Sequence, residues 1–431
     1  MSNVITLPRP ASARPSAARF GLYLRVGHNQ HRELADVLSS GECDFHGIVI
    51  DATNVERHKD LTNRALSMGL DVALDPKTHA MALPGGFSHS MSKLPWGGDS
   101  HSGLVQFTGT AGKNVAQQIA QFAVEHGFTQ VLAPTHILSG RNDRWIKCDV
   151  ENAIHLRNAL LDCGSGAQVI FPLALPMQVF RNPVERRAII NQIQDVPCDA
   201  LWLRVENFGA DSTGDKTTAY IEASRELQTI GKPVIADHAG GVAGLGLLAF
   251  GAVGGLAHGI TLLEGFKAAQ WRRPPNPEGR KGSAFTRIYI PKLDLYLKRD
   301  DAEAFFKSST RTRGRYACRD SHCCAGGMRD MLSNPARHFV HQRSNEILTL
   351  SGQPDSLRPG LYLDQTVRSV SDDIASAAAL SSIDDSLRKK LQKKQSTMSR
   401  FRLAMTHFAE VENSVVDVRR PTPRIERSKL G

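Results

Sequence analysis

The chain has 431 residues, of which 41% are hydrophobic and 22% are charged, an ordinary composition for a globular protein. Its 53 Lys and Arg outnumber its 43 Asp and Glu, and the formal net charge of +10 favours nucleic acid or another anionic partner. No run of about 18 apolar residues occurs, so we expect no membrane span. Residues 1–19 lack the apolar core of a secretory signal, and we interpret them as a flexible leader on a cytoplasmic protein.

Short apolar runs recur along the chain with amphipathic helical patterns between them. Eight runs begin at Phe20, Gly47, Asp71, Gln130, Gln168, Ala200, Pro233 and Gly254. The helical patterns cover 55–68, 114–127, 150–163, 182–195 and 219–230. Apolar strands that alternate with helices predict a parallel sheet covered on its outer face. Eight such units in about 240 residues predict an α/β fold in which residues 20–270 form a (β/α)8 TIM barrel.

The connection over residues 76–112 interrupts this alternation. It is rich in Gly, Ser, Pro and His and contains Trp96. A long loop after a barrel strand emerges at the end of the barrel where active sites lie. Two interpretations stay open, a loop that covers the substrate and a surface insertion.

Residues 271–350 follow the barrel and predict a linker, a hairpin and a small Cys/His module. The run RIYIPKLDLYLK, with Pro291 between two strand-like halves, is typical of a hairpin or of edge strands. Residues 351–431 predict a basic helical region with a disordered tail. An apolar stripe with a basic opposite face there indicates a docked helix, a surface for nucleic acid, or a contact with a second copy or another protein. The stripe consists of Leu387, Leu391, Met398, Phe401, Met405 and Phe408.

Polar side chains at the carboxyl ends of the predicted strands are the candidate active site, because the loops at that end build the active site of a barrel. A buried carboxyl has a tunable pKa and can act as base or nucleophile, and histidine can transfer protons. Such residues can also simply cap strands. The candidate catalytic residues are Asp51, Asp75, Asp237 and His238, with Asp294 in the hairpin; the candidate substrate ligands are Arg25, His136, Arg204, Glu206 and His258.

The glycine-rich run from Ala236 to Gly259 is a second candidate for substrate binding. Glycine lets backbone amides approach a phosphate closely, and the loops after the last two barrel strands often bind one. Gly240, Gly241, Gly254 and Gly255 stand at suitable places.

A cluster of cysteines and histidines predicts a metal site. Zinc needs three or four thiolate or imidazole ligands, and Cys318, Cys323 and Cys324 with His338 or His341 supply enough. His322 is an alternative ligand, because adjacent cysteines point apart in an extended chain. A fully ligated structural zinc is the preferred interpretation, and reduced or redox-active thiols are the alternative.

Two short motifs resemble the tRNA-guanine transglycosylases, which exchange a guanine base for a 7-deazaguanine through a covalent aspartyl intermediate. GGLAHG from Gly254 is similar to that family's GGLAVG loop, and HFVHQRSNEIL from His338 is similar to its helix that supplies a zinc histidine. The resemblance implies that Gly254, Gly255 and Leu256 contact the base. It also implies an aspartate nucleophile, for which Asp51, Asp75, Asp237 and Asp294 are the candidates. The family's DSGGFQ motif and its cysteine spacing are not found.

Three functions follow from these patterns. The first is a transferase, a glycosyltransferase that exchanges bases in DNA or RNA. The second is a metabolic lyase or hydrolase that binds a small phosphorylated or carboxylated substrate through Arg25 and Arg204. The third is a nucleic-acid-binding adaptor without catalytic activity.

Overall fold

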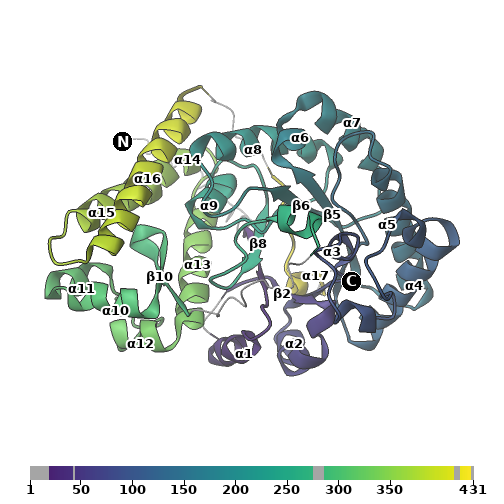
Figure 1. Ribbon diagram of the computed structural model, residues 1–431, viewed down its shortest axis with the longest axis horizontal. Helices are drawn as coiled ribbons and strands as arrows, with labels where there is room; N and C mark the ends of the chain where they lie inside the picture. The colour runs from purple at the N-terminus through teal and green to yellow at the C-terminus, as the bar shows by residue number, and fades with distance from the viewer. Residues whose placement is uncertain (1–18, 42–43, 275–285, 412–417, 429–431) are drawn as a thin grey trace, which may run out of the picture.

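Eight parallel strands form a closed barrel in the computed structural model, which describes residues 19–41, 44–274, 286–411 and 418–428 (Figure 1). Each strand pairs with the next, and β1 closes the ring on β8 with Gly21 opposite Gly255. The predicted (β/α)8 barrel is therefore confirmed, while the predicted leader falls almost wholly outside the described residues. The strands are β1 (Gly21–Arg25), β2 (Gly47–Asp51), β3 (Asp71–Asp75), β4 (Gln130–Leu132), β5 (Gln168–Pro176), β6 (Ala200–Glu206), β7 (Val234–Asp237) and β8 (Gly255–Gly259).

The strands are buried on both faces, which explains their continuous apolar sequences. Side chains that point inward fill the barrel, and the ring of Trp202 lies 5.2 Å from that of Tyr23 at its centre. Side chains that point outward pack under the helices. At the carboxyl ends of β1, β2, β3, β6 and β7 the inward-facing positions are polar, and this change from apolar to polar defines the barrel mouth.

The helices between the strands cover the outer face of the barrel. Asn182 caps α7 as its sequence predicts, since its side chain accepts a hydrogen bond from the Val184 amide at 3.0 Å with Pro183 in the first turn. Short helices η1 (Ala52–Asn54), η2 (Glu56–His58) and η5 (Gln228–Ile230) extend some connections. The main helices are α1 (His31–Ser40), α2 (Lys59–Ser67), α4 (Gly109–Glu125), α5 (Trp145–Asp162), α6 (Met177–Arg181), α7 (Pro183–Ile193), α8 (Gly214–Leu227) and α9 (Gly241–Ala249).

The connection over residues 76–108 is folded rather than structureless. It contains α3 (Thr78–Met81), η3 (Met91–Lys93) and η4 (Leu104–Phe107). Trp96 is buried, donates its indole N–H to the Pro76 carbonyl at 3.2 Å and packs edge-on against Phe122 of α4. The predicted insertion is thus anchored to the barrel.

The segment after β8 supplies the missing eighth outer helix. Helix α13 (Pro335–Ser351) packs against both α9 and α1, the place that a helix directly following β8 would take. The His258 side chain points outward from β8 and meets the ring of Phe339 in α13, with ring centroids 5.8 Å apart. The Cys/His module is therefore part of the barrel wall.

An antiparallel hairpin lies between β8 and α13, as predicted from RIYIPKLDLYLK. Strands β9 (Arg287–Ile290) and β10 (Leu295–Lys298) are joined by η7 (Pro291–Leu293), and Asp294 adopts a left-handed φ of 41° at the turn. Figure 1 shows the hairpin and the module helices grouped on one side of the barrel. These helices are α10 (Arg299–Lys307), α11 (Thr310–Tyr316) and α12 (Met328–Ser333), and η6 (Ala268–Arg272) precedes the hairpin. The predicted linker falls partly on residues 275–285, outside the described residues.

The C-terminal region is helical, as predicted. The apolar stripe of α16 (Asp385–Val411) is buried against α8 and α15 (Ser369–Ala378), so the chain itself covers it. None of the helices among the described residues has the length and apolar character to cross a membrane. The other elements of this region are α14 (Arg358–Leu361), the π-helix η8 (Tyr362–Arg368) and α17 (Arg424–Arg427).

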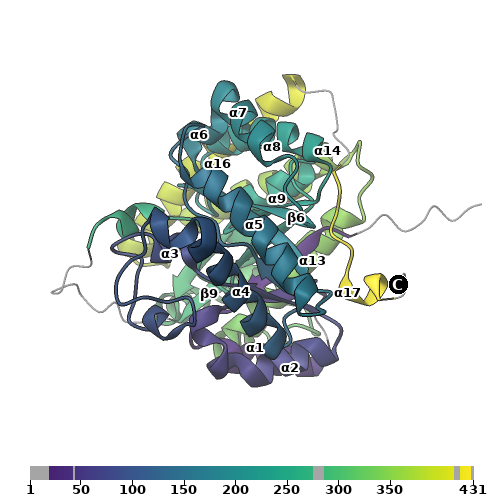
Figure 2. The same cartoon turned by 90° about the vertical axis from the view of Figure 1, so that its right-hand side faces the viewer.

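The predicted disordered tail is wrong for residues 418–428. This segment runs across the amino-terminal end of the barrel, and both views show α17 far from α16 and on the side of α2 (Figures 1 and 2). Arg427 binds the fully buried carboxylate of Asp71 with N–O distances of 2.5 and 3.2 Å. Arg427 thus supplies the cation for a buried acid and ties residues 418–428 to the barrel.

Candidate active site at the barrel mouth

Two arginines and two aspartates form a closed ionic network in the barrel mouth. Arg25 on β1 donates two hydrogen bonds of 2.6 Å to Asp237 on β7 and one of 2.9 Å to Asp75 on β3. Arg204 on β6 bridges the same carboxylates, at 2.7 Å to Asp237 and 2.8 Å to Asp75. All four side chains are at most 4% exposed. The network is neutral, and four strands are needed to assemble it.

Both carboxylates of this network are ionised. Burial by itself would raise the pKa of Asp237, but Arg25 and Arg204 outweigh it and lower that pKa. The same two arginines hold the pKa of Asp75 well below its usual value. Each carboxylate accepts several charge-assisted hydrogen bonds, so its oxygens are already engaged.

A second set of polar side chains surrounds the network. His79 of α3 is buried and accepts a hydrogen bond of 2.9 Å from Arg204, which requires the neutral ring. Asp51 is 28% exposed and lies 3.4 Å from the Lys77 ammonium and 3.9 Å from Arg25. Asp51 is thus more accessible and less tightly bound than the network aspartates Asp75 and Asp237.

His238 follows Asp237 and faces the same space. Its Nδ1 donates to the Leu263 carbonyl at 3.2 Å, and its Nε2 lies 4.0 Å from Asp237. Burial lowers its pKa to about 3, with help from Arg25 and against the effect of Asp237. The ring is therefore neutral at pH 7, and its Nε2 can accept a hydrogen bond.

Backbone strain is concentrated at this end of the barrel. Five residues other than glycine, each within four positions of the end of β3, β6, β7 or β8, have φ between 59° and 64°, a region that L-residues seldom occupy. Strain of this kind persists only where the surroundings enforce it, and it clusters at functional sites. The five are Lys77, Asn207, His238, Thr261 and Leu263.

A pocket of about 400 Å³ lies beside the network, between the ends of β7 and β8 and the hairpin. Three aromatic residues line it, Phe266, Trp271 and Tyr296, together with the polar side chains of His238 and Glu264. Further lining residues are Ala210, Asp211, Thr261, Leu262, Leu263, Gly265, Lys267, Gln270 and Arg287. The pocket thus combines aromatic ring surfaces with a few polar groups.

The segment from Phe266 to Arg272 crosses the mouth and separates this pocket from another. Arg272 binds Glu206 at the end of β6 through two bonds of 2.7 Å, and the Trp271 carbonyl accepts the Gly85 amide at 2.7 Å. On the far side lies a pocket of about 740 Å³, with Arg181 and Lys216 among its lining residues. Glu206 therefore anchors the crossing segment.

The glycine-rich loop after β7 already holds an anion from the chain itself. The Gly241 amide at the start of α9 donates to the carboxylate of Glu264 at 3.3 Å, and Arg343 binds the same oxygen at 3.2 Å. A Cβ at Gly240 would lie 2.0 Å from that carboxylate. The place predicted for a phosphate is thus occupied by Glu264.

The second half of the glycine run lies at the other end of the barrel. Gly254 and Gly255 stand at the start of β8, where a Cβ would collide with Arg419 and with Gly21. Leu256 is buried within the strand and packs with the outer core. The structure therefore does not bring these residues to the mouth, and their glycines serve close backbone packing.

Two other sequence candidates make internal contacts. His136 is bound to Asp149 of α5 at 2.6 Å and stacks on Trp145 at 3.6 Å between ring centroids. His136, Asp149 and Cys148 are near enough to one another to suggest a metal, but the 2.6 Å contact is a hydrogen bond and leaves no room for an ion between those two groups. Asp294 is buried in the hairpin and paired with Lys394 of α16 at 2.8 Å.

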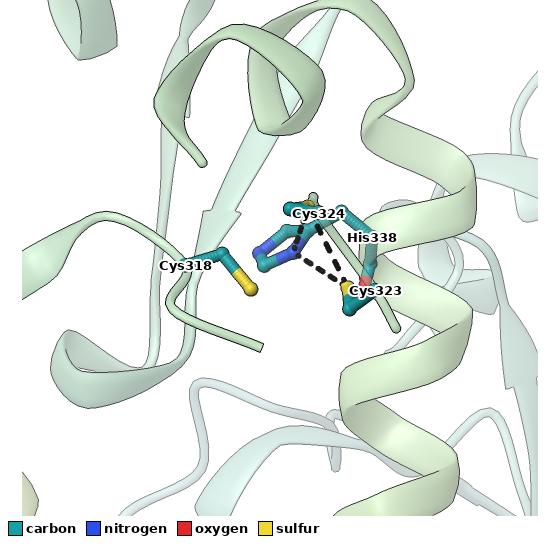
Figure 3. Close-up of side chains that lie close together, drawn as sticks. All are labelled: Cys318, Cys323, Cys324 and His338. Carbon is teal, nitrogen blue, oxygen red and sulfur yellow. Dashed lines mark hydrogen bonds between the residues drawn. The ribbon is translucent and has the colours of Figure 1, made fainter. Parts of the chain in front are cut away.

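The four donors Cys318, Cys323, Cys324 and His338 converge in the Cys/His module and could hold a metal ion (Figure 3). The Cys323 and Cys324 sulfurs are 3.6 Å apart and lie 3.4 and 3.5 Å from the Nδ1 of His338. A turn in which the Cys324 amide bonds back to the Asp320 carbonyl brings the adjacent cysteines together. The expectation that adjacent cysteines point apart is therefore wrong here.

The predicted ligand His341 does not join the cluster. Its Nδ1 lies 3.1 Å from the Asn345 amide and 3.5 Å from Asp320. His338 instead offers Nδ1, because its Nε2 lies 3.1 Å from the Tyr289 carbonyl and must donate to it. His322 is not among the converging donors.

Several residues of the mouth carry no sequence signal strong enough to find them. Glu264, Phe266 and Trp271 lie beyond the last predicted strand, and His79 lies inside the predicted insertion. Tyr296 reaches the pocket from the hairpin, 37 residues after Gly259 at the end of β8. Only the assembled fold shows that they share one site.

No sequence-family model matches the chain, and no curated protein matches it in sequence. Among solved structures, a type I 3-dehydroquinate dehydratase from Clostridium difficile is similar, with 10% sequence identity and a TM-score of 0.35. The match covers 58% of this chain and 88% of the dehydratase chain. A GH18 chitinase from Pseudoalteromonas aurantia is similar at 10% identity, 56% and 93% coverage and a TM-score of 0.35. An endo-β-1,4-mannanase from Cellulomonas fimi is similar at 10% identity and a TM-score of 0.37, and the match covers 61% of this chain and 68% of the mannanase chain. This likeness concerns the barrel fold alone.

Proposed function

We propose that the protein is an enzyme that binds a nucleobase-type ring in the pocket between the barrel mouth and the hairpin. The observation that carries this proposal is the aromatic pocket beside a strained and charged mouth. Phe266, Trp271 and Tyr296 provide faces on which a planar ring can stack, and His238 and Glu264 provide polar contacts at its edge. The volume of about 400 Å³ lies in the range of roughly 300–1,000 Å³ that is typical of ligand sites.

A cluster of cations at the rim of the pocket supports the proposal that the bound base belongs to a nucleic acid. Arg287, which lines the pocket, stands directly opposite Lys298 across the hairpin, and like charges so placed are unfavourable. Lys390 of α16 adds a third cation, since its ammonium binds the Tyr296 carbonyl at 2.8 Å. Burial and these two neighbours lower the pKa of Lys390, although Asp301 opposes them. A phosphate at this rim would relieve the repulsion.

The reaction that fits these groups is base exchange, with Asp51 as the reacting carboxylate. Asp75 and Asp237 are bound by two arginines each, whereas Asp51 is partly exposed and has only weaker cationic neighbours. The Asp51 carboxylate would attack the anomeric carbon of the nucleotide while the bond between that carbon and the base breaks. The departing base would gain a proton. An incoming base would then displace the carboxylate and lose a proton, so that the exchange balances.

Zinc is the metal that best fits the Cys/His cluster. Zn–S bonds of about 2.3 Å and a Zn–N bond of about 2.0 Å in a tetrahedron place sulfurs about 3.8 Å apart and sulfur and nitrogen about 3.5 Å apart. The separations among Cys323, Cys324 and His338 are 3.4 to 3.6 Å. Four protein ligands would leave no open position, which supports a structural role.

The proposed reaction is tested by incorporation of labelled guanine into tRNA and into DNA. Asp51→Asn should lower the rate at least about 100-fold, since loss of a positioned catalytic group costs that much or more, while the protein stays folded. Asp60→Asn, an exposed change on α2, is the matched control and should have no effect. Exchange that survives Asp51→Asn would contradict the assignment. Binding without any exchange would favour an adaptor.

A small anionic substrate is the second candidate, and the pocket on the far side of the crossing segment favours it. Arg181 and Lys216 line that pocket, together with Arg272, which Glu206 already neutralises. A lyase or hydrolase for a phosphorylated or carboxylated metabolite would use the two remaining cations. Arg25 and Arg204, proposed from the sequence for this role, are saturated by aspartates. Binding of small carboxylates that is lost in Arg181→Gln would favour this candidate.

A further inference from the structure

A short series of contacts connects the Cys/His cluster with the wall of the mouth pocket. His338 offers Nδ1 to the cluster and donates its Nε2 proton to the Tyr289 carbonyl at 3.1 Å. Tyr289 lies in β9 directly opposite Tyr296 in β10, and their ring centroids are 5.1 Å apart. Tyr296 lines the pocket and donates its hydroxyl proton to Glu264, which also lines it. Two residues, Tyr289 and Tyr296, thus separate the cluster from Glu264.

The same wall is joined to helix α13 by a buried ionic contact. Arg343 is fully buried and binds Glu264 at 3.2 Å and Glu346 at 2.8 Å. Its guanidinium stacks on Tyr289 at 5.2 Å from the ring centroid. Glu346 also accepts the Tyr289 hydroxyl at 3.2 Å. The contacts of Arg343 and Glu346 with Tyr289 therefore depend on the relative position of α13 and β9.

The Cys/His cluster also touches this interface, because His338 of α13 bonds to the Tyr289 carbonyl of β9. Cys318, Cys323 and Cys324 belong to the turn region before α12, whereas His338 belongs to α13. Without an ion, weak thiol and imidazole contacts hold the four donors together. Four metal bonds would hold them rigidly and would orient the imidazole toward Tyr289.

We propose that metal bound by Cys318, Cys323, Cys324 and His338 positions the pocket wall, with Tyr289 and Tyr296 as the positioning residues. The metal takes no part in the chemistry. It keeps β9 in place through the imidazole of His338, and β10 then holds the Glu264 carboxylate at the edge of the pocket. Loss of the metal should loosen the hairpin and the segment after β8 while the remaining barrel strands stay intact.

Hydrogen–deuterium exchange of the full chain, with and without EDTA, tests this proposal. Zinc content is measured in the same samples. We expect amides of 287–298 and 261–267 to exchange at least about tenfold faster after metal loss, whereas β2 to β6 keep their protection. Unchanged exchange in the hairpin after proven metal loss would overturn the proposal. Faster exchange throughout the barrel would overturn it as well, because the metal would then stabilise the whole fold.

Two variants separate positioning from folding. Tyr296→Phe removes only the hydroxyl that binds Glu264, and it should retain zinc and the melting temperature but bind free guanine several-fold more weakly. Cys324→Ser should lose zinc and reproduce the exchange pattern of the EDTA-treated protein. Cys163→Ser, at an exposed cysteine outside the cluster, is the matched control. A Tyr296→Phe variant with unchanged guanine affinity would contradict the role of Tyr296.

The guanine measurement rests on the proposed function, whereas the exchange measurement does not. Failure of the metal-loaded protein to bind guanine would count against the nucleobase proposal. It would leave the link between metal and pocket wall to be decided by the exchange pattern alone. The two outcomes are therefore distinguishable.

Discussion

Asp237 is the residue on which the mouth depends most strongly. It accepts three charge-assisted hydrogen bonds from Arg25 and Arg204, and its side chain is completely buried. Bringing four charges out of water is costly, and the cost is recovered only if every partner is present. The network is therefore expected to be intolerant of any single neutral substitution.

Asp237→Asn should destabilise the protein by about 3–5 kcal/mol, because it leaves an uncompensated positive charge among buried groups. Asp51→Asn makes the same chemical change at a partly exposed position and should cost less than about 1 kcal/mol. Urea denaturation of both variants measures the difference. Equal losses would show that burial of the network is less complete than the structure indicates.

His46 should make the protein sensitive to acid. Burial, followed by the effects of Arg19 and Arg427, lowers its pKa from 6.5 to about 4. The unfolded chain therefore binds the proton more tightly than the folded one. Stability contributed by the neutral ring is present above pH 6.5 and is lost as the pH falls toward 4, on the order of 3 kcal/mol in total.

His46→Gln removes this titration but keeps an acceptor for the Leu22 amide, which His46 Nδ1 accepts at 3.4 Å. The free energy of unfolding, measured between pH 7 and pH 4, should fall less steeply in the variant. Part of the pH dependence of the free energy of unfolding will remain in the variant, because burial also lowers the pKa of His79 and of His258. An identical slope in both proteins would contradict the assignment to His46.

The sequence indicates the polar strand ends but not their partners. Alternating apolar runs place Arg25, Asp75, Arg204 and Asp237 at one end of the barrel, because the side-chain period of a strand and the parallel order leave little choice. Which of these charges cancel depends on distances across the barrel. Similarly, the cysteine spacing predicts a metal site, but only the turn at Asp320 decides that both adjacent cysteines point inward.

At the scale of elements, two segments take positions that local sequence does not reveal. Helix α13 completes the outer ring of the barrel although the hairpin and three helices separate it from β8. Residues 418–428 cross the opposite end of the barrel and supply Arg427 to Asp71. Both placements depend on contacts between residues far apart in the chain, and the basic composition of the tail suggested disorder instead.

Arg427→Gln should lower the free energy of unfolding by about 3 kcal/mol, because Asp71 is then buried without a cation. Burial already raises the pKa of Asp71, and Arg427 opposes this effect. Arg424→Gln is the comparison variant, since Arg424 acts on Asp71 only through its charge and donates its hydrogen bonds to the carbonyls of Leu66 and Leu70, so its loss should cost about 1 kcal/mol. Equal melting temperatures of the two variants would show that the tail contributes no specific ion pair.

At the scale of the whole molecule, the proposed binding of nucleic acid should depend on salt, because the net charge is +10 and cations lie at the pocket rim. The logarithm of the binding constant should fall linearly with the logarithm of the salt concentration. Arg287→Gln should reduce this slope by about 1, the loss of one phosphate contact. Lys147→Gln, an exposed change on α5, should leave it unchanged. Equal slopes for the two variants would show that the pocket rim is not part of the binding surface.

Binding of free guanine to the mouth pocket tests most directly whether a nucleobase is the ligand. Calorimetric titration of the metal-loaded protein should detect one site per chain. Trp271→Leu, which removes a stacking face of the pocket, should weaken binding by about 1–3 kcal/mol, roughly 5- to 150-fold. Arg181→Gln, in the pocket on the far side of the crossing segment, should leave the affinity unchanged. No binding of guanine, or binding that only Arg181→Gln weakens, would contradict a nucleobase site at the barrel mouth.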